Sequence, residues 1–277
     1  MQTIKLELLE LLRRHDLLRA SLLIGKVQDA NFSMEYHFEK IMEMAAQVWH
    51  RCSRNKEDGI QKAREIINVL FTEANLAGKA EKEKSTIDDP HRYYLHSVLD
   101  RKVGSPLTTT ILFSILADQV GLKYECLAMP TYYLIKISDP TGDVFIDPYD
   151  NGRFINGEEF QKKMRSAIHR SKLLSSSLFE KVTAYQLVAR LVQQLKHIYI
   201  LKGKAPEALR AVELLTVLFP QSPELTRDRG ILYCEIEYFS KAAEDLKFYL
   251  TQRPNASDVN EIKKLASMLK GCREIIN

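Results

Sequence analysis

The sequence predicts an α+β protein that is predominantly helical, and three observations carry this prediction. Apolar residues recur every three or four positions through most of the 277 residues, which is the period of an amphipathic helix. Short β-branched and aromatic segments interrupt this period once, at residues 122–148. Glycine and proline number only 11 and 9, so long helices are favoured over turn-rich β structure.

The first hundred residues predict an arm of helices. Spaced leucines predict helix over residues 4–26, with a break near His15-Asp16. Further helices are predicted over 33–52, where Ser33 can cap the first turn, and over 60–74. Asp89-Pro90 pairs a capping carboxylate with a proline at the first helical position, and predicts one helix that stops near Gly104.

The next segment predicts a buried helix with a small sheet behind it. Ser105-Pro106 repeats the helix-start signal, and the residues up to Gly121 are apolar nearly all round, as in a central helix. Residues 124–129, 132–137 and 144–146 then predict short strands. The turn signal at 139–143 predicts that the last two strands form an antiparallel hairpin.

From about residue 178 the chain is helical again and repeats itself. Three pairs of like residues are each 34 positions apart: Tyr199 and Tyr233, Ala208 and Ala242, Pro220 and Pro254. Helix pairs with this period, with an aromatic, a small alanine and a terminal proline, are tetratricopeptide repeats. We therefore predict two domains, residues 1–178 and 179–277, with a capping helix at 258–269.

Four stretches carry a resemblance to a known family. They are "YYLHSVLDRKVGSPLTTTILFSILADQVGL" (93–122), "MPTYYLIK" (129–136), "FIDPYDNGRF" (145–154) and "LTRDRGILYCEIEYFSKAAEDLKFYL" (225–250). With the order of elements, they make the chain similar to the bacterial SirB-type family along nearly its whole length. The resemblance implies a helical arm, a transglutaminase-like (papain-like) core with a small antiparallel sheet, and C-terminal tetratricopeptide helix pairs.

The resemblance also implies where catalytic residues would stand. This fold normally hosts a Cys-His-Asp arrangement, and those positions fall on Pro106, Tyr132 and Asp147. Proline supplies neither a nucleophile nor a backbone N–H for an oxyanion hole, and a phenol with a pKa of about 10 is a poor general base. We expect Asp147 to fix a turn before Pro148, and the chain to be a non-catalytic pseudoenzyme that acts as a scaffold.

The alternative is a degenerate hydrolase or transferase of the same fold that uses a non-standard nucleophile. Thr108, Thr109 and Thr110 lie in the first turns of the predicted buried helix, but no histidine falls within residues 97–168 to activate them. Reactivity towards an electrophilic probe separates this alternative from the scaffold.

Tetratricopeptide repeats imply contact with a protein or peptide partner. The first helix of each pair lines the groove in this architecture. The 34-residue register places Arg190, Gln193 and His197 there in the first repeat, and Arg227 and Glu235 in the second. Because guanidinium groups pair bidentately with carboxylates, the two arginines suit an acidic segment. The competing interpretation is that these residues are solvated or face the protein's own core.

Composition argues against other classes of function. A net charge of +4 is too small to indicate nucleic-acid binding, and no segment reaches the roughly 20 apolar residues of a membrane span. Charged residues interrupt the N-terminal apolar positions, unlike a signal peptide. The four cysteines are scattered without a CxxC pair, and no phosphate-binding glycine loop occurs. We expect no metal, no cofactor and a cytoplasmic location.

Overall fold

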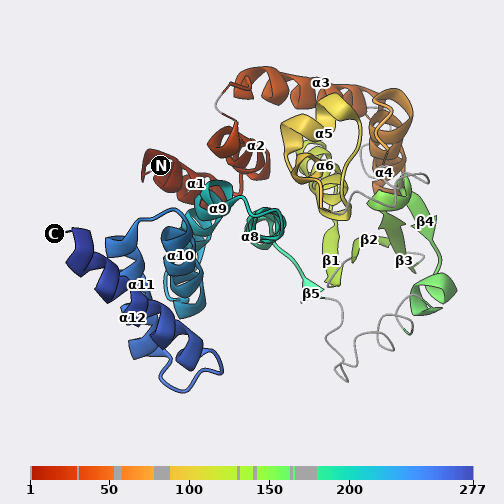
Figure 1. The fold of residues 1–277 in the computed structure, drawn as a ribbon. Coiled ribbons are helices and arrows are strands. Elements are labelled where there is room, and N and C mark those ends of the chain that lie inside the picture. The colour runs from red at the N-terminus through yellow and green to blue at the C-terminus, as the bar shows by residue number, and fades with distance from the viewer. Residues whose placement is uncertain are drawn as a thin grey trace. The chain divides into compact units, whose positions relative to one another are not determined.

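The computed structural model describes residues 2–29, 31–52, 58–77, 88–129, 132–139, 142–162, 165 and 180–276. The chain forms two compact units (Figure 1), one from Glu10–Leu191 and one from Met1–Leu9 with Val192–Asn277. The predicted boundary between residues 178 and 179 lies outside the described residues.

The predicted arm is helical, with the predicted break. Helix α1 (Gln2–Arg13) ends before His15, whose positive φ of 57° turns the chain, and α2 (Leu17–Gln28) follows. The Asp16 carboxylate caps α2 by accepting from the backbone N–H of Arg19 at 2.9 Å. Ser33 caps α3 (Met34–Cys52) as predicted, since its hydroxyl accepts from the N–H of Tyr36. Helix α4 (Gly59–Ile67) continues into a π-helical turn, η1 (Asn68–Glu73).

The single helix predicted from Asp89 to Gly104 is wrong. Asp89 caps one 3₁₀ turn, η2 (Pro90–Arg92), and the chain then extends at Tyr94 before α5 (Leu95–Arg101) begins. Residues 92–99 are all buried, and a continuous amphipathic helix at the edge of a core cannot bury every consecutive side chain. The break at Tyr94 lets Arg92, Tyr93 and Tyr94 turn inward from different backbone directions.

The buried helix is α6 (Pro106–Gln119). All residues from Leu107 to Ala117 are buried, so this helix has no solvent face. It contacts α2, α3, α4 and α5, strand β2 and the turn η3 (Pro148–Asp150). The remaining elements of the larger unit are therefore arranged around it.

The sheet is antiparallel and has the strand order β4-β3-β2-β1-β5. Its members are β1 (Glu125–Met129), β2 (Tyr132–Asp139), β3 (Gly142–Asp147), β4 (Arg153–Ile155) and β5 (Glu180–Lys181). The predicted hairpin is confirmed, with Asp139 opposite Gly142. Strands β4 and β5 were not predicted, because three and two residues are too short to show an alternating pattern. Residues 122–148 therefore supply only part of the sheet.

The C-terminal helices repeat with the predicted period. They are α8 (Ala184–Leu201), α9 (Ala205–Leu218), α10 (Pro223–Glu235), α11 (Phe239–Gln252) and α12 (Val259–Ile276). Gly203 and Glu237, 34 positions apart, turn the chain with φ values of 63° and 64°, and Ala208 and Ala242 are both fully buried. At Gly230 a Cβ would lie 2.9 Å from the Leu246 side chain, so glycine permits the close helix contact.

A buried histidine joins α2, α3 and α5 in the larger unit. The His96 ring stacks on Phe32 with 4.1 Å between centroids and lies edge-on to His37 at 5.7 Å. A Cβ at Gly25 would lie 2.5 Å from His96 Nδ1, so α2 approaches the ring as closely as a glycine allows. Burial, with a smaller effect of His37, lowers the pKa of His96 from 6.5 to about 4.

We expect this histidine to make the fold acid-sensitive. Because the ring is neutral when folded and titrates near 6.5 when unfolded, the unfolded chain binds more protons between these values. The free energy of unfolding should fall by about 3 kcal/mol as the pH drops from 6.5 to 4. Urea titrations across this range measure it. A His96→Gln variant should lose this part of the slope, and the exposed His15→Gln should keep it; equal slopes in all three would contradict the assignment.

Candidate functional site

The candidate site begins at the N-terminus of α6, where a capping box closes the helix. The Ser105 hydroxyl accepts from the N–H of Thr108 at 3.2 Å, and Thr108 Oγ1 accepts from the N–H of Ser105 at 2.8 Å. Pro106 occupies the first helical position and has no N–H to offer. A helix N-terminus can present its free backbone N–H groups to a substrate. Here the N–H of residue 106 does not exist, and the N–H groups of Ser105 and Thr108 are used in the cap.

The hydroxyls of the three threonines in this helix donate hydrogen bonds to backbone carbonyls. Thr108 Oγ1 donates to the carbonyl of Arg92 at 2.9 Å. Thr109 Oγ1 donates to the carbonyl of Ser105 at 3.0 Å, and Thr110 Oγ1 donates to that of Pro106 at 2.8 Å. All three threonines are fully buried. In this arrangement each hydroxyl proton is held by a carbonyl, which is not a general base.

Arg92, which no pattern in the sequence marks, connects this helix end to the turn η3. Its Nε and Nη2 donate to the carbonyl of Gly104 at 2.9 and 2.6 Å, and Nη2 also donates to the Tyr149 hydroxyl at 3.2 Å. The side chain is only 8% exposed. No local pattern marks this role, because the contacts reach across 12 and 57 residues of sequence.

Tyr132 and Asp147 form the second part of the site. The Tyr132 hydroxyl donates to Asp147 Oδ2, and Asp147 Oδ1 accepts from the N–H groups of Tyr149 and Asp150 at 3.1 and 3.2 Å. Burial and the adjacent carboxylate both raise the pKa of Tyr132 above its usual range. The phenol therefore remains protonated and donates. Asp147 also caps the turn η3 at Pro148, the role that the sequence analysis assigned to it.

The structure brings the three predicted positions to neighbouring elements. Tyr132 begins β2 and Asp147 ends β3 directly before η3, and α6, which begins at Pro106, contacts both β2 and η3. Tyr132 and Asp147 are joined directly, and the Arg92 guanidinium spans the distance from the α6 N-terminus to η3. The arrangement holds the helix end, the strand and the turn together.

The described cysteines are not activated. Burial raises the pKa of the Cys126 thiol to about 12, and also raises the pKa values of Cys52 and Cys234. The side chain of Cys272 lies outside the described part of the chain. Among the described residues, no group of three or more His, Cys, Asp or Glu side chains is placed to hold a metal ion.

The residues predicted to line the repeat groove differ in their surroundings. Arg190, in the larger unit, pairs with Glu180 at 2.8 Å. Arg227 is half-buried, contacts both Asp228 and Asp258 at 2.7 Å, and lies over the Tyr249 ring. Gln193, His197 and Glu235 are exposed. The charge of each arginine is therefore already balanced inside the fold, whereas the other three side chains face solvent.

Helix α6 is buried from residue 107 to residue 117 and contacts strand β2 of the antiparallel sheet. With the helix pairs of 34-residue period that follow, this arrangement defines a transglutaminase-like core followed by tetratricopeptide repeats. Residues 36–193, more than half of the chain, match the Transglutaminase-like superfamily, and the chain belongs to this superfamily. Residues 195–267 match the Tetratricopeptide repeat family. Among the described residues, no helix has both the length and the apolarity to cross a membrane.

Several bacterial proteins share this sequence pattern. A UPF0162 protein of Xylella fastidiosa is 25% identical over 178 residues, 63% of each chain. UPF0162 protein PM0557 of Pasteurella multocida is 26% identical, over 66% of this chain and 71% of its own. UPF0162 protein YchA of Escherichia coli is 24% identical over 58% of this chain and 60% of its own. The match thus spans less than two thirds of the Xylella protein. The solved structure of menin aligns with a TM-score of 0.40 and 11% identity, over 96% of this chain and 70% of menin.

We expect Tyr132 and Asp147 to stabilise the fold as a pair. Asp147→Ala should lower the free energy of unfolding by about 3 kcal/mol, because it removes the buried carboxylate that accepts from the half-buried Tyr132 hydroxyl and from two N–H groups. Tyr132→Phe should cost about 1 kcal/mol, since the carboxylate keeps its backbone donors. Urea unfolding of both single variants and the double variant should give a coupling of about 1 kcal/mol. Additive effects would show that the pair does not act as a unit, and the exposed Tyr36→Phe serves as the control.

Proposed function

We propose that this chain is a non-catalytic transglutaminase-like scaffold whose tetratricopeptide helices hold a protein or peptide partner. One observation carries the first half of the proposal. At the α6 N-terminus, where a cysteine nucleophile and its oxyanion donors would stand in this fold, Pro106 offers neither, and the hydroxyls of the three following threonines donate to carbonyls. The protonated Tyr132 is engaged with Asp147, and so it cannot accept a proton from a nucleophile.

The partner half of the proposal is supported by the exposed face of α8. Gln193 and His197 are four residues apart, on one face of the helix, and Leu201, 60% exposed, continues that face. Because Arg227 is balanced by Asp228 and Asp258, recognition falls to these exposed side chains rather than to an arginine clamp. We also assign the protein to the cytoplasm, where the free thiols of Cys52, Cys126 and Cys234 would stay reduced.

Catalytic inactivity is tested with an electrophilic thiol probe and with assays of amine incorporation and of amide and peptide hydrolysis. We expect no turnover and slow labelling, because burial keeps the pKa of the Cys126 thiol at about 12. Pro106→Cys is the positive control: this half-buried position at a helix N-terminus favours thiolate and should label at least about tenfold faster. Turnover in the wild type that Tyr132→Phe or Asp147→Ala abolishes would instead establish the degenerate enzyme.

The partner surface is tested by site-specific photo-crosslinking in the source cell. A crosslinking residue placed at Gln193 or His197 should capture a common partner, whereas one at the exposed Lys263 of α12 should not. The affinity of the captured partner is then measured by calorimetry, and His197→Ala should weaken it about tenfold if this side chain is a hot spot. Equal capture from all three positions, or an unchanged affinity, would place the contact elsewhere.

A further inference from the structure

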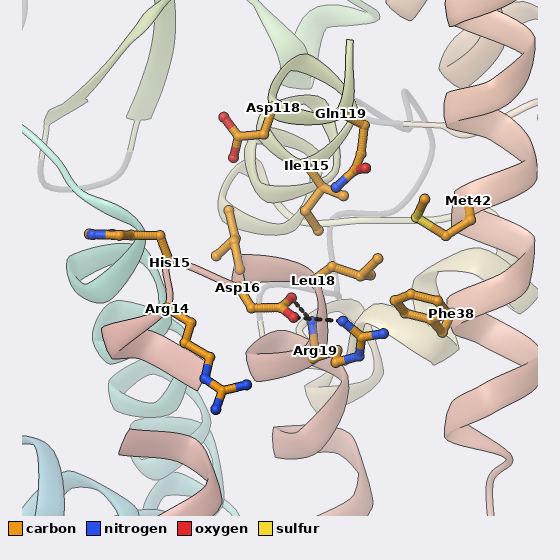
Figure 2. A pocket seen from close by; sticks show the side chains of 11 residues that line it. Arg14, His15, Asp16, Leu18, Arg19, Phe38, Met42, Ile115, Asp118 and Gln119 are labelled. Atoms are coloured by element: carbon orange, nitrogen blue, oxygen red, sulfur yellow. Dashed lines mark hydrogen bonds and ion pairs between the residues drawn. The ribbon is translucent and has the colours of Figure 1, made fainter. Parts of the chain in front are cut away.

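A cavity lies at the C-terminal end of α6, opposite the end that Pro106 begins. Its volume is about 350 Å³, within the range of small-molecule sites. The turn between α1 and α2, helix α3 and the last turn of α6 form its walls, and all lining residues belong to the larger unit (Figure 2). The site described above uses none of these residues.

The two arginines of the cavity are already neutralised. Arg19 Nη1 donates to Asp16 Oδ2 at 2.9 Å, and the guanidinium lies 4.2 Å from the centre of the Phe38 ring. The other Asp16 oxygen caps α2. Arg14 pairs with Glu10, one turn back on α1. Neither guanidinium therefore brings uncompensated positive charge to the cavity.

Asp118 supplies a carboxylate that the two arginines leave unmatched; partial burial raises the pKa of this group, and the exposed His15 also lines the cavity. Among the described residues, no lysine, arginine or histidine forms an ion pair with its carboxylate, which interacts with the uncharged hydroxyl of Tyr124. Asp118 also lies in the last turn of α6, where the helix dipole adds partial negative charge. An anion would meet repulsion here, whereas a cation would satisfy both the carboxylate and the helix end.

The rest of the lining suits an apolar chain. Leu18, Ile115 and Met42 come from three different helices and line the cavity together with Phe38; Gln119 lies on the same side as Met42 in Figure 2, and Asp118 is its neighbour in the last turn of α6. Methionine adapts its shape to a ligand at little cost. The Gln119 amide adds a neutral hydrogen-bonding group beside the carboxylate.

We propose that this cavity binds a compact organic cation, a guanidinium or ammonium group carried on a short apolar chain. The guanidinium or ammonium group would pair with Asp118 at the helix end, and its chain would lie against Leu18, Met42 and Ile115. No covalent step is involved.

The test uses the full-length protein with n-butylguanidinium and with N-butylurea, a neutral molecule of nearly the same shape. Calorimetry should give a one-to-one complex with butylguanidinium, with a Kd on the order of 1 mM, as expected for so few atoms. Butylurea should bind at least about tenfold more weakly. In ¹H–¹⁵N spectra, the shifts should concentrate at residues 15–19 and 118–119 and at the Gln119 side-chain amide.

Two variants of equal charge change complete the test. Asp118→Asn should reduce the affinity for butylguanidinium to that for butylurea, while Glu43→Gln, on the exposed face of α3, should leave it within about twofold. The proposal would be overturned by equal binding of the two ligands or by an unchanged affinity in Asp118→Asn. It would also be overturned by shifts centred on other residues, or by no binding up to about 20 mM.

Discussion

The hydrogen-bonded cap at the N-terminus of α6 is the constraint on which the larger unit depends. A helix whose first turns are buried cannot leave its first N–H groups to water, so the protein must supply partners for them. Ser105 and Thr108 do so reciprocally, and Thr108 then fixes the backbone of Arg92. The Arg92 side chain returns to the Gly104 carbonyl. These hydrogen bonds, with the one from Arg92 to the Tyr149 hydroxyl, hold together the segment before α5, the start of α6 and the turn η3 after β3.

The same hydrogen bonds limit the chemistry that is available at the N-terminus of α6. Catalysis at a helix N-terminus requires donors and a nucleophile that are free until a substrate arrives. Here the N–H groups of Ser105 and Thr108 are used in the cap, Pro106 has no N–H, and Tyr132 donates to Asp147. Freeing these groups for chemistry would leave buried polar atoms unsatisfied, which costs about 1–3 kcal/mol each. Stability and reactivity therefore compete for the same atoms, and the contacts that these atoms make here are the reason that we propose a non-catalytic role.

Local signals in the sequence were sufficient for most elements. Helix α6 begins at the Ser-Pro pair, as the sequence predicts. The 34-residue period is also seen in the structure, where Gly203 and Glu237 make the same left-handed turn in the two repeats. The failures have a different origin. The break at Tyr94 accompanies a contact between Arg92 and a carbonyl 12 residues away, and strand β5 pairs with β1 across more than fifty residues of sequence. Neither partner can be read from the local sequence. The cavity is assembled from three separate helical segments, so no single stretch of sequence indicates it.

The two arginines that were predicted to bind an acidic segment, Arg190 and Arg227, each form ion pairs with carboxylates of this chain. The pairs of Arg227 are long-range in sequence or shared with a third residue. Arg227 and Asp258 are 31 residues apart, and a further pair, Lys196 with Asp228, shares the Asp228 carboxylate with Arg227. This row of alternating charges joins α8, α10 and the start of α12, and it compensates the desolvation of each member. A partner that bound the Arg227 guanidinium would have to break its ion pairs with Asp228 and Asp258. These two half-buried carboxylates would then lose the guanidinium that balances them. In the function that we propose, the exposed side chains of α8 rather than Arg227 therefore contact the partner, and in the larger unit the proposed cation pairs with Asp118, which has no ion-pair partner of its own among the described residues.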